Sequence, residues 1–330
     1  MVMIIPEKLK PGDMVRVIAP SNTMSETVKI NSKNALKRFN EDLCLNVSFG
    51  KHINHTDKLN STSIESRIDD LHSAFSDQKV KAVFAVMGGF NSNQLLKYID
   101  WSVISNNPKI FCGYSDITAL NLAILSKTNI ITYSGPVYAT FNDEINFEYT
   151  LDYVRRCLFS LNQFTIEPSK LWSDDKWYID QQQRNLIKNT GHLIINKGSA
   201  EGTIIGTNLS TINLLQGSEF FPQPKNSILF LEDDYNSKPA IFDRQLQALL
   251  HLPGFIKVKG LVLGRFQKES YINDNDLIRI IKSKKELSIM PIIANVDFGH
   301  TQPMVTLPIG GLAKISISDS VNSKIEVIEH

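Results

Sequence analysis

The sequence predicts an α/β protein with two domains, and three observations favour this fold class. Short apolar runs typical of buried parallel strands alternate with segments of helical periodicity, which is the pattern of βαβ units around a parallel sheet. The chain has 330 residues, which is about twice the size of a common domain. A polar, irregular stretch, residues 141–201, separates two regions of the alternating pattern. The simplest arrangement is two α/β domains joined by a crossover in this stretch.

The first region, residues 1–140, contains three predicted strands and three predicted helices. Residues 81–87 (KAVFAVM) form the clearest strand, because an almost continuous apolar run that ends at a glycine pair suits a strand buried on both faces. The other two strands are shorter apolar runs that end at breaker residues. The expected strands are residues 14–19, 81–87 and 109–112, and the expected helices are residues 29–39, 93–98 and 116–126.

The middle segment, residues 141–201, and the last region, residues 202–330, differ in character. The middle segment is predicted to hold a helix, residues 149–160, followed by a linker and an ordered loop that contains Trp172 and Trp177. In the last region short strands alternate with two helices, and the chain ends in a strand-like section. The expected strands are residues 203–205, 227–231, 260–263 and 313–329, and the expected helices are residues 239–250 and 274–286.

Charge and cysteine content narrow the function classes. Thirty-five basic and 34 acidic residues leave a formal net charge of +1, which argues against binding to a nucleic-acid polymer. Cys44, Cys112 and Cys157 are scattered and form no CxxC pair, which argues against a disulfide framework or a structural zinc site. The N-terminus lacks the pattern of a secretory signal, and no stretch approaches the roughly 18 apolar residues of a membrane span. We therefore expect a soluble, cytoplasmic protein without a membrane partner.

The first candidate for chemistry is the turn Gly113-Tyr114-Ser115-Asp116, between a predicted strand and a predicted helix. A sharp turn there would expose the Ser115 hydroxyl and point the free N–H groups of the helix at an oxyanion. The turn resembles a nucleophile elbow, although it lacks the second glycine of GxSxG. The alternative is that Ser115 and Asp116 only cap the helix.

A second candidate is the pair Gly88-Gly89, followed by Phe90, Asn91 and Ser92, at the end of a predicted buried strand. Glycines there would let a substrate approach the backbone, whose N–H groups can stabilise an oxyanion. A dinucleotide-binding fingerprint is a rival interpretation, but the GxGxxG spacing and its acidic follow-up are absent. The alternative without function is an ordinary β–α turn.

The last two candidates are an acidic run and a histidine. Glu232-Asp233-Asp234 follows a predicted strand and can orient a histidine or bind a cation, but no pattern such as HExxH supports a metal. His300 lies in the constrained sequence Gly299-His300-Thr301-Gln302-Pro303, which suits a general base. A solvated turn and a structural histidine are the alternatives. Together the candidates offer a nucleophile, an acid and a base in the chain order Ser, Glu, His.

Five segments of the chain resemble the LD-carboxypeptidase family, the serine peptidases of the S66 type. These segments are LKPGDMVRVIAPSN, GYSDIT, GTIIGTNLSTINLLQG, FLEDD and GHTQPMVTLPIG, and they run through nearly the whole chain. The resemblance implies Ser115 as the nucleophile, Glu232 as the triad acid and His300 as the base. It also implies the backbone N–H groups of Gly89 and Asp116 as oxyanion donors.

The same resemblance implies an architecture. The N-terminal domain is expected to be Rossmann-like and to carry the nucleophile, and the C-terminal β/α domain to carry the glutamate and the histidine, with the active site between them. A homodimer is expected, and no metal or organic cofactor is needed for the implied chemistry.

One departure from the family pattern points to a branch within it. Murein-recycling LD-carboxypeptidases typically continue the double glycine with Tyr-Gly, whereas this chain has Phe90-Asn91 and so resembles the branch that contains the microcin C immunity (MccF) proteins. That branch cuts peptidyl- or aminoacyl-nucleotide antibiotics and places an aromatic side chain against the nucleotide base. Trp172 or Trp177 is expected to supply that ring, and Gly88, Phe90 and Asn91 to contact substrate. The alternative for each tryptophan is that it only packs the loop onto its domain.

The resemblance therefore predicts a serine carboxypeptidase or amidase that acts on a small peptide or an aminoacyl-nucleotide. Removal of the terminal D-alanine from murein tetrapeptide is the alternative within the family. A non-catalytic ligand-binding module or a nucleotide-dependent oxidoreductase is the alternative from another class, because a Rossmann-like fold alone does not decide function.

Overall fold

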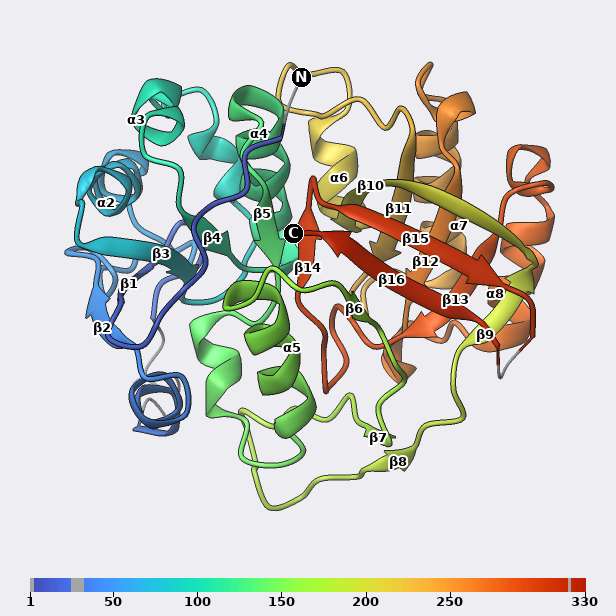
Figure 1. Cartoon of the computed structure of the whole chain (residues 1–330), viewed down its shortest axis with the longest axis horizontal. Helices are drawn as coiled ribbons and strands as arrows, with labels where there is room; N and C mark the ends of the chain where they lie inside the picture. Colours follow the sequence, from blue (N-terminus) through green and yellow to red (C-terminus); the bar gives the residue numbers. More distant parts are fainter. Residues whose placement is uncertain (1–2, 25–32, 320–321) are drawn as a thin grey trace.

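The computed structural model describes residues 3–24, 33–319 and 322–330, and its strands form two large sheets (Figure 1). The first sheet has six strands in the order β14-β5-β4-β3-β1-β2. The second has eight strands in the order β6-β16-β15-β10-β11-β12-β13-β9, and β7 and β8 form a separate ribbon. Parallel strands make up the centre of both sheets, with helices between them in the chain. The predicted two-domain α/β fold is confirmed.

Five parallel strands form most of the first sheet. They are β1 (Met14–Ile18), β2 (Asn46–Phe49), β3 (Val80–Ala85), β4 (Ile110–Cys112) and β5 (Thr132–Ser134). The sixth strand comes from far along the chain, because β14 (Leu307–Ile309) pairs antiparallel with β5. The α-helices of this part are α2 (Ile64–Ser76), α3 (Trp101–Ser105) and α4 (Thr118–Thr128).

The second sheet has four parallel strands at its centre and antiparallel strands on both sides. The parallel strands are β10 (Gly198–Asn208), β11 (Ser227–Glu232), β12 (Gly260–Gly264) and β13 (Ile292–Val296). The antiparallel strands are β6 (Phe164–Thr165), β9 (Leu193–Asn196), β15 (Leu312–Ile317) and β16 (Lys324–Glu329). The helices are α6 (Leu209–Leu215), α7 (Pro239–Leu250) and α8 (Asp274–Lys282).

The middle segment and the short helical turns complete the chain. The middle segment contains α5 (Glu148–Leu158) and the ribbon of β7 (Leu171–Trp172) and β8 (Ile187–Lys188), which lies at the lower edge of the molecule in Figure 1. A π-helical turn, η1, spans Arg38–Asp42. The 3-10 turns are η2 (Ser92–Leu95), η3 (Ser115–Ile117), η4 (Tyr138–Asn142), η5 (Phe255–Lys257), η6 (Lys268–Ser270) and η7 (Lys285–Leu287).

Several predicted elements differ from the observed ones. The helix expected at residues 93–98 is only the 3-10 turn η2, because Asn and Ser side chains compete for backbone hydrogen bonds and so favour turns; the N–H and hydroxyl of Ser92 fix the start of this turn to Asp116. The strand-like section 313–329 is the hairpin of β15 and β16. Residues 29–32 of the helix expected at 29–39 lie outside the described residues, and residues 33–37 are helical.

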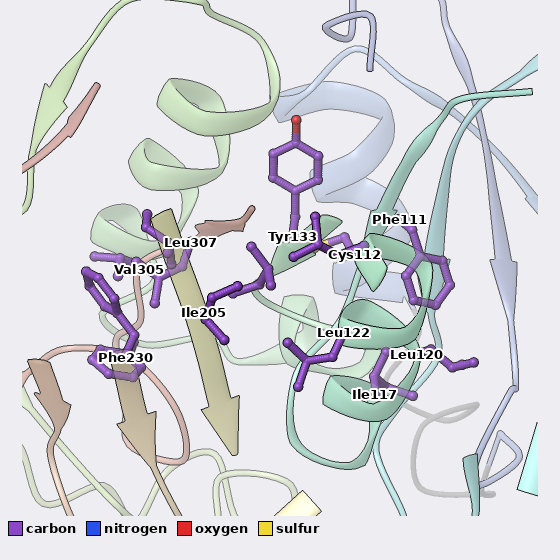
Figure 2. Close-up of a cluster of buried hydrophobic side chains, with 14 of the residues drawn as sticks. Phe111, Cys112, Ile117, Leu120, Leu122, Tyr133, Ile205, Phe230, Val305 and Leu307 are labelled. Carbon is purple, nitrogen blue, oxygen red and sulfur yellow. The ribbon is translucent and has the colours of Figure 1, made fainter. Parts of the chain in front are cut away.

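Apolar side chains from both sheets form one continuous core. Nine of the 11 residues of α4 are buried, and this helix packs against both β5 and β10. A helix that is apolar on all sides suits such a position between two layers. Figure 2 shows Ile205 of β10 between Tyr133 and Cys112 of the first sheet and Phe230 of β11. The two sheets therefore hold a fixed position relative to each other.

The packing of the sheets decides where the candidate residues lie. The segments after β3 and β4 carry the glycine pair and Ser115, Glu232 ends β11, and the segment after β13 carries His300. All four strands are parallel within their own sheets, so these residues lie at carboxyl ends, where α/β proteins place their ligand sites. Among the described residues, no helix has both the length and the apolar character needed to cross a membrane.

We predict that Gly206→Ala strongly destabilises the protein. Gly206 lies in β10 at φ +151°, and an added Cβ would lie 1.8 Å from the Phe230 carbonyl oxygen of the neighbouring strand. Unfavourable backbone conformation and overpacking together should lower the free energy of unfolding by about 3 kcal/mol, measured by urea denaturation.

Gly12→Ala is the matched control for this substitution. Gly12 also has a positive φ, +90°, but an added Cβ would have no heavy atom within 4 Å. Gly12→Ala should therefore lower the free energy of unfolding only through its backbone conformation, by about 1–2 kcal/mol. Equal destabilisation by the two variants would contradict the steric argument.

Candidate active site

Three predicted site residues, Ser115, Glu232 and His300, lie within hydrogen-bonding distance in a line. His300 Nε2 is 3.0 Å from Ser115 Oγ, and His300 Nδ1 is 2.6 Å from Glu232 Oε2. Ser115 follows β4 of the first sheet, whereas Glu232 ends β11 and His300 follows β13 of the second sheet. The three side chains therefore meet where the two sheets face each other, and their order is that of a nucleophile, a base and an acid.

The backbone of Ser115 has an unusual conformation. Its φ of +62° is in the left-handed region, which a residue with a Cβ rarely adopts and which is frequent at functional turns. Gly113 begins the turn, and its carbonyl oxygen accepts a hydrogen bond from Asn121 Nδ2 at 2.9 Å. Buried Ile117 occupies the place of the second glycine of GxSxG. The turn thus has the strand–turn–helix arrangement of a nucleophile elbow without that glycine.

The surroundings of His300 favour proton transfer from Ser115. Burial disfavours the charged imidazolium, but the adjacent Glu232 carboxylate, with further help from Asp234 and Asp233, raises the pKa of His300 above its ordinary value. Glu232 is only 1% exposed and accepts the hydrogen bond of Nδ1–H, which leaves Nε2 to face the serine. The Tyr114 ring packs edge-on against the imidazole with centroids 5.3 Å apart.

Gly89 and Asp116, the expected oxyanion donors, line the same cavity as Ser115. The Asp116 carboxylate is held away from reaction chemistry, because it accepts hydrogen bonds from Ser21 Oγ at 2.5 Å and from the Ser92 N–H at 2.8 Å. Gly89 lies at φ +156°, and an added Cβ would be 2.3 Å from Ser21 Oγ. The ends of β1, β3 and β4 are therefore tied together around the serine.

Two cavities adjoin the candidate triad, one lined by Ser115 and the other by His300. The first, which we call the polar cavity, has a volume of about 360 Å³. It contains Ser115 and side chains that offer hydrogen bonds, namely Asn208, Ser210, Asp233, Asp234 and Gln245. The second, which we call the aromatic cavity, has a volume of about 470 Å³. It contains His300 and four aromatic rings, namely Tyr114, Trp177, Tyr178 and Tyr235.

The two tryptophans lie in different places. Trp177 lines the aromatic cavity next to His300. Trp172 lines another cavity of about 650 Å³, where the Arg265 guanidinium is 4.8 Å and the Lys268 ammonium 5.6 Å from its ring centroid. Of the two rings, Trp177 is thus the one beside the candidate triad.

The residues predicted to contact substrate after β3 also lie in different places. Gly88 lines the aromatic cavity, and Phe90 lines the polar cavity with 80% of its surface exposed. Asn91 instead binds Arg67, whose guanidinium donates to both its side-chain and its backbone oxygen at 3.1 Å. The geometry therefore gives Asn91 a part in positioning this loop.

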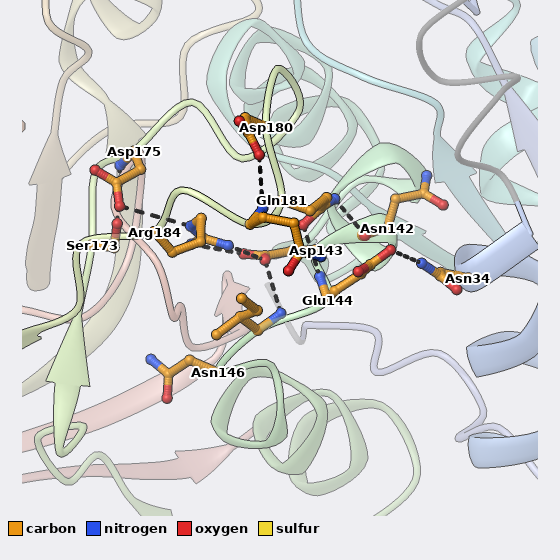
Figure 3. A network of polar contacts seen from close by, with 12 residues as sticks. Asn34, Asn142, Asp143, Glu144, Asn146, Ser173, Asp175, Asp180, Gln181 and Arg184 are labelled. Carbon is orange, nitrogen blue, oxygen red and sulfur yellow. Dashed lines mark hydrogen bonds and ion pairs between the residues drawn. The ribbon is translucent and has the colours of Figure 1, made fainter.

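The loop that carries Trp177 is fixed by a polar network to residues 142–144, at the start of the middle segment (Figure 3). Arg184 forms an ion pair with Asp143, and both side chains are only 2% exposed. Gln181 donates to the Asn142 carbonyl oxygen at 3.0 Å, and its own oxygen accepts from the Glu144 N–H at 3.2 Å. These contacts hold the loop between Ser173 and Asn185 over the aromatic cavity.

Several site residues were not singled out by sequence reasoning. Asn208 is the last residue of β10, caps α6 through Thr211 N at 3.0 Å, and donates to Asp233 at 3.1 Å. It lies in the segment GTNLST, where an Asn before a helix was the available signal. Tyr178 and Tyr235 line the aromatic cavity from an irregular loop and a turn, for which no local pattern exists.

Comparisons with known proteins find relatives over most of the chain. A model of the LD-carboxypeptidase N-terminal domain matches residues 15–135, and a model of the C-terminal domain of the same family matches residues 201–315. The putative carboxypeptidase YocD of Bacillus subtilis is 48% identical over 98% of this chain and 99% of its own. The microcin C7 self-immunity protein MccF of Escherichia coli is 32% identical over 85% of this chain and 83% of its own.

Solved structures give the same result. A MccF-like protein from Bacillus anthracis superposes with a TM-score of 0.96 at 48% identity, covering 99% of this chain and 100% of that one. MccF in complex with aspartyl sulfamoyl adenosine has a TM-score of 0.88 at 28% identity, with 99% of both chains covered. MccF with glutamyl sulfamoyl guanosine has a TM-score of 0.88 at 27% identity, with 98% of both chains covered.

We predict a pH dependence for the reactivity of Ser115. The imidazole accepts the serine proton only when neutral, and the pKa of His300 is raised above the ordinary 6.5. The rate at which a serine-directed phosphonate labels Ser115 should therefore rise with pH through a midpoint above 6.5. Intact-mass spectrometry over pH 5–9 measures this rate.

Glu232→Gln tests the cause of this pH dependence. It removes the charge that raises the pKa of His300, so the midpoint should move to lower pH while the maximal labelling rate falls, because the tautomer is less well fixed. A midpoint that stays unchanged in Glu232→Gln would contradict the role given to this carboxylate.

Proposed function

The chain belongs to the LD-carboxypeptidase family of serine peptidases, and from this premise we propose that it is a MccF-like serine carboxypeptidase or amidase that hydrolyses the amide bond of peptidyl- or aminoacyl-nucleotide compounds of the microcin C type. Such hydrolysis would confer self-immunity or detoxification. The observation that carries the proposal is the hydrogen-bonded line of Ser115, His300 and Glu232 beside an aromatic cavity.

The proposed mechanism is acyl transfer to a serine. His300 Nε2 takes the proton of the Ser115 hydroxyl as its oxygen attacks the carbonyl carbon of the substrate. Glu232 holds the proton of Nδ1, and it stabilises the imidazolium that forms. His300 then gives its proton to the leaving amine as the C–N bond breaks. In the second half, His300 takes a proton from water as the water oxygen attacks the acyl carbon, and it returns that proton to Ser115 Oγ as the ester bond breaks and the acid is released.

The oxyanion of the tetrahedral intermediate is assigned to the backbone N–H groups of Gly89 and Asp116. Both residues flank Ser115 in the polar cavity, and the Asp116 helix turn adds its positive dipole end. Loss of one such donor typically costs about 2.7–4 kcal/mol of transition-state stabilisation. The chemistry uses no metal or organic cofactor in this proposal.

The two cavities suggest how the substrate is oriented. His300 must reach the leaving amine, and it lines the aromatic cavity, so the nucleotide is assigned to that side. Trp177 is available there for stacking on the base, which is worth roughly 1–3 kcal/mol per base in single-strand binders. The acyl residue then occupies the polar cavity. MccF itself has been solved with aspartyl sulfamoyl adenosine and with glutamyl sulfamoyl guanosine, which supports this class of substrate.

Removal of D-alanine from murein tetrapeptide is the second candidate function. It is supported by the probable murein peptide carboxypeptidase of Bacillus subtilis, which is 29% identical over 98% of this chain and 94% of its own. The chemistry at Ser115 would be the same, with D-alanine rather than a nucleotide as the leaving group. A homodimer and a cytoplasmic location remain predictions of the family resemblance.

The decisive experiment is a side-by-side hydrolysis assay of an aminoacyl sulfamoyl adenosine and murein tetrapeptide by the wild-type chain and Ser115→Ala. We expect cleavage of the nucleotide compound, and a loss of about 10⁴-fold or more in kcat for Ser115→Ala with unchanged thermal stability. Cleavage of the tetrapeptide alone would replace the first function by the second. Near-normal turnover by folded Ser115→Ala would contradict both.

We predict that the two tryptophans differ in their effect on nucleotide binding. Trp177→Ala should raise KM for the aminoacyl sulfamoyl adenosine by roughly 10–100-fold, because it removes the ring beside His300. Trp172→Ala is the matched control, since the same truncation is made in a separate cavity, and it should change KM less than threefold. A larger effect of Trp172→Ala would reverse the assignment.

A further inference from the structure

The charged groups of the polar cavity all have the same sign. Its described lining residues include three aspartates, Asp116, Asp233 and Asp234, and they include no lysine, arginine or histidine. The Asp116 carboxylate is already bound by Ser21 and Ser92. The cavity assigned to the acyl residue therefore has a negative electrostatic potential, which favours a positively charged ligand group.

Asp233 is the most unusual of these acids. It is 1% exposed, and Oδ1 accepts hydrogen bonds from Ser210 Oγ at 2.9 Å, the Asp234 N–H at 3.0 Å and Asn208 Nδ2 at 3.1 Å. Oδ2 is also buried, and it has no hydrogen-bond partner among the described residues. A buried carboxylate oxygen without a partner is costly, and it indicates a place for a group that the unliganded protein lacks.

None of the described residues that line the polar cavity brings a positive charge to Asp233, and His300, whose pKa Asp233 helps to raise, is already paired with Glu232. The adjacent Glu232 is also acidic, and Glu232 is the residue that pairs with His300. Burial, together with the Glu232 charge, accordingly raises the pKa of Asp233 to about 6. Neutral donors on Asn208 and Ser210 hold one oxygen in place, so the carboxylate is positioned but not neutralised.

We propose that Asp233 accepts an ammonium group of the acyl residue, so that the polar cavity selects substrates whose acyl part carries an amine and disfavours acidic acyl groups. This inference rests on the proposed function, since it assigns the acyl residue to the polar cavity next to Ser115. An ammonium group would supply both the missing hydrogen-bond donor of Oδ2 and the missing positive charge. The group can be the α-ammonium or a side-chain ammonium, and the chemistry at Oδ2 is the same.

The proposal separates this chain from the MccF complexes. Those complexes contain aspartyl and glutamyl groups, which bring a side-chain carboxylate. Beside Asp233 and Asp234 such a carboxylate would face like charges, which is unfavourable in a partly buried cavity. A preference for lysyl-type over glutamyl compounds is therefore expected of this chain.

The test measures binding rather than cleavage, by titration calorimetry with Ser115→Ala. The probes are lysyl sulfamoyl adenosine, its Nα-acetyl and Nε-acetyl derivatives, and glutamyl sulfamoyl adenosine. We expect one of the two acetylations to weaken binding about tenfold or more, which identifies the ammonium that Asp233 binds. In Ser115→Ala with Asp233→Asn, the same acetylation should change affinity less than about twofold, because the partner charge is gone. Glutamyl sulfamoyl adenosine should bind at least tenfold more weakly than the lysyl compound to Ser115→Ala.

Asp152→Asn in the same background is the matched control. It makes the same acid-to-amide change on the exposed side of α5, where Asp152 pairs with Arg156, and it should leave the acetylation effect unchanged. The comparison of the lysyl and glutamyl compounds on Ser115→Ala keeps Asp233 unchanged. It therefore tests the proposal even if Asp233→Asn folds poorly.

Three results would overturn the proposal. They are equal binding of all lysyl derivatives, an acetylation effect that persists in Asp233→Asn, and glutamyl binding as tight as lysyl binding. Failure of the wild-type chain to cleave compounds that bind with the expected preference would contradict the proposed function alone. Absence of binding by every compound would contradict both.

Discussion

The packing of α4 between the two sheets is the constraint on which the candidate site depends. Ser115 belongs to the first sheet, while Glu232 and His300 belong to the second, so the distance of 3.0 Å between Ser115 Oγ and His300 Nε2 is set by how the sheets pack. Buried hydroxyl groups define this packing further, because Thr207 of β10 lies 3.3 Å from Thr118 of α4 and 3.0 Å from Ser134 of β5. Buried polar contacts must be satisfied, so they permit fewer relative positions than apolar contacts alone.

Three consecutive acids at the end of β11 show how surroundings give the same chemistry different roles. Glu232 is paired with a histidine, and its charge raises the pKa of that histidine. Asp233 is held by neutral donors, and its own pKa is raised by burial and by Glu232. Asp234 lines both cavities and is more exposed than the other two. Strand β11 ends at Glu232, so Asp233 and Asp234 lie in the segment that leaves the sheet, and Asn208 Nδ2 contacts both Glu232 and Asp233.

Local patterns predicted some of the features that depend on nearby residues, but α2, α6 and β13 were missed. The apolar strand before the Ser115 turn and the helix after it were visible in the sequence, and α7 (Pro239–Leu250) was predicted with its observed ends because Pro239 suits the first turn of a helix. Features that depend on distant contacts were not predictable. The three residues of β14 pair with β5 from 173 positions away, as in Leu307 with Ser134, and nothing local distinguishes them from a loop. The choice between Trp172 and Trp177 likewise depended on which loop lies over His300.

The division of the site into two cavities follows from the same constraint. The polar cavity is bounded by α6 and α7 of the second domain and by the glycine loop, so its character is set by Asn208, Ser210 and the acids after β11. The aromatic cavity is bounded on one side by the loop that the Arg184–Asp143 ion pair fixes within the middle segment. The two cavities share Asp234 and each takes one residue of the glycine pair, but only the aromatic cavity is lined by the loop that carries Trp177, and only the polar cavity by α6 and α7. The loop between Ser173 and Asn185 contributes none of the three residues Ser115, His300 and Glu232. Substitutions in this loop can therefore change the preferred leaving group while the geometry of the three residues stays intact.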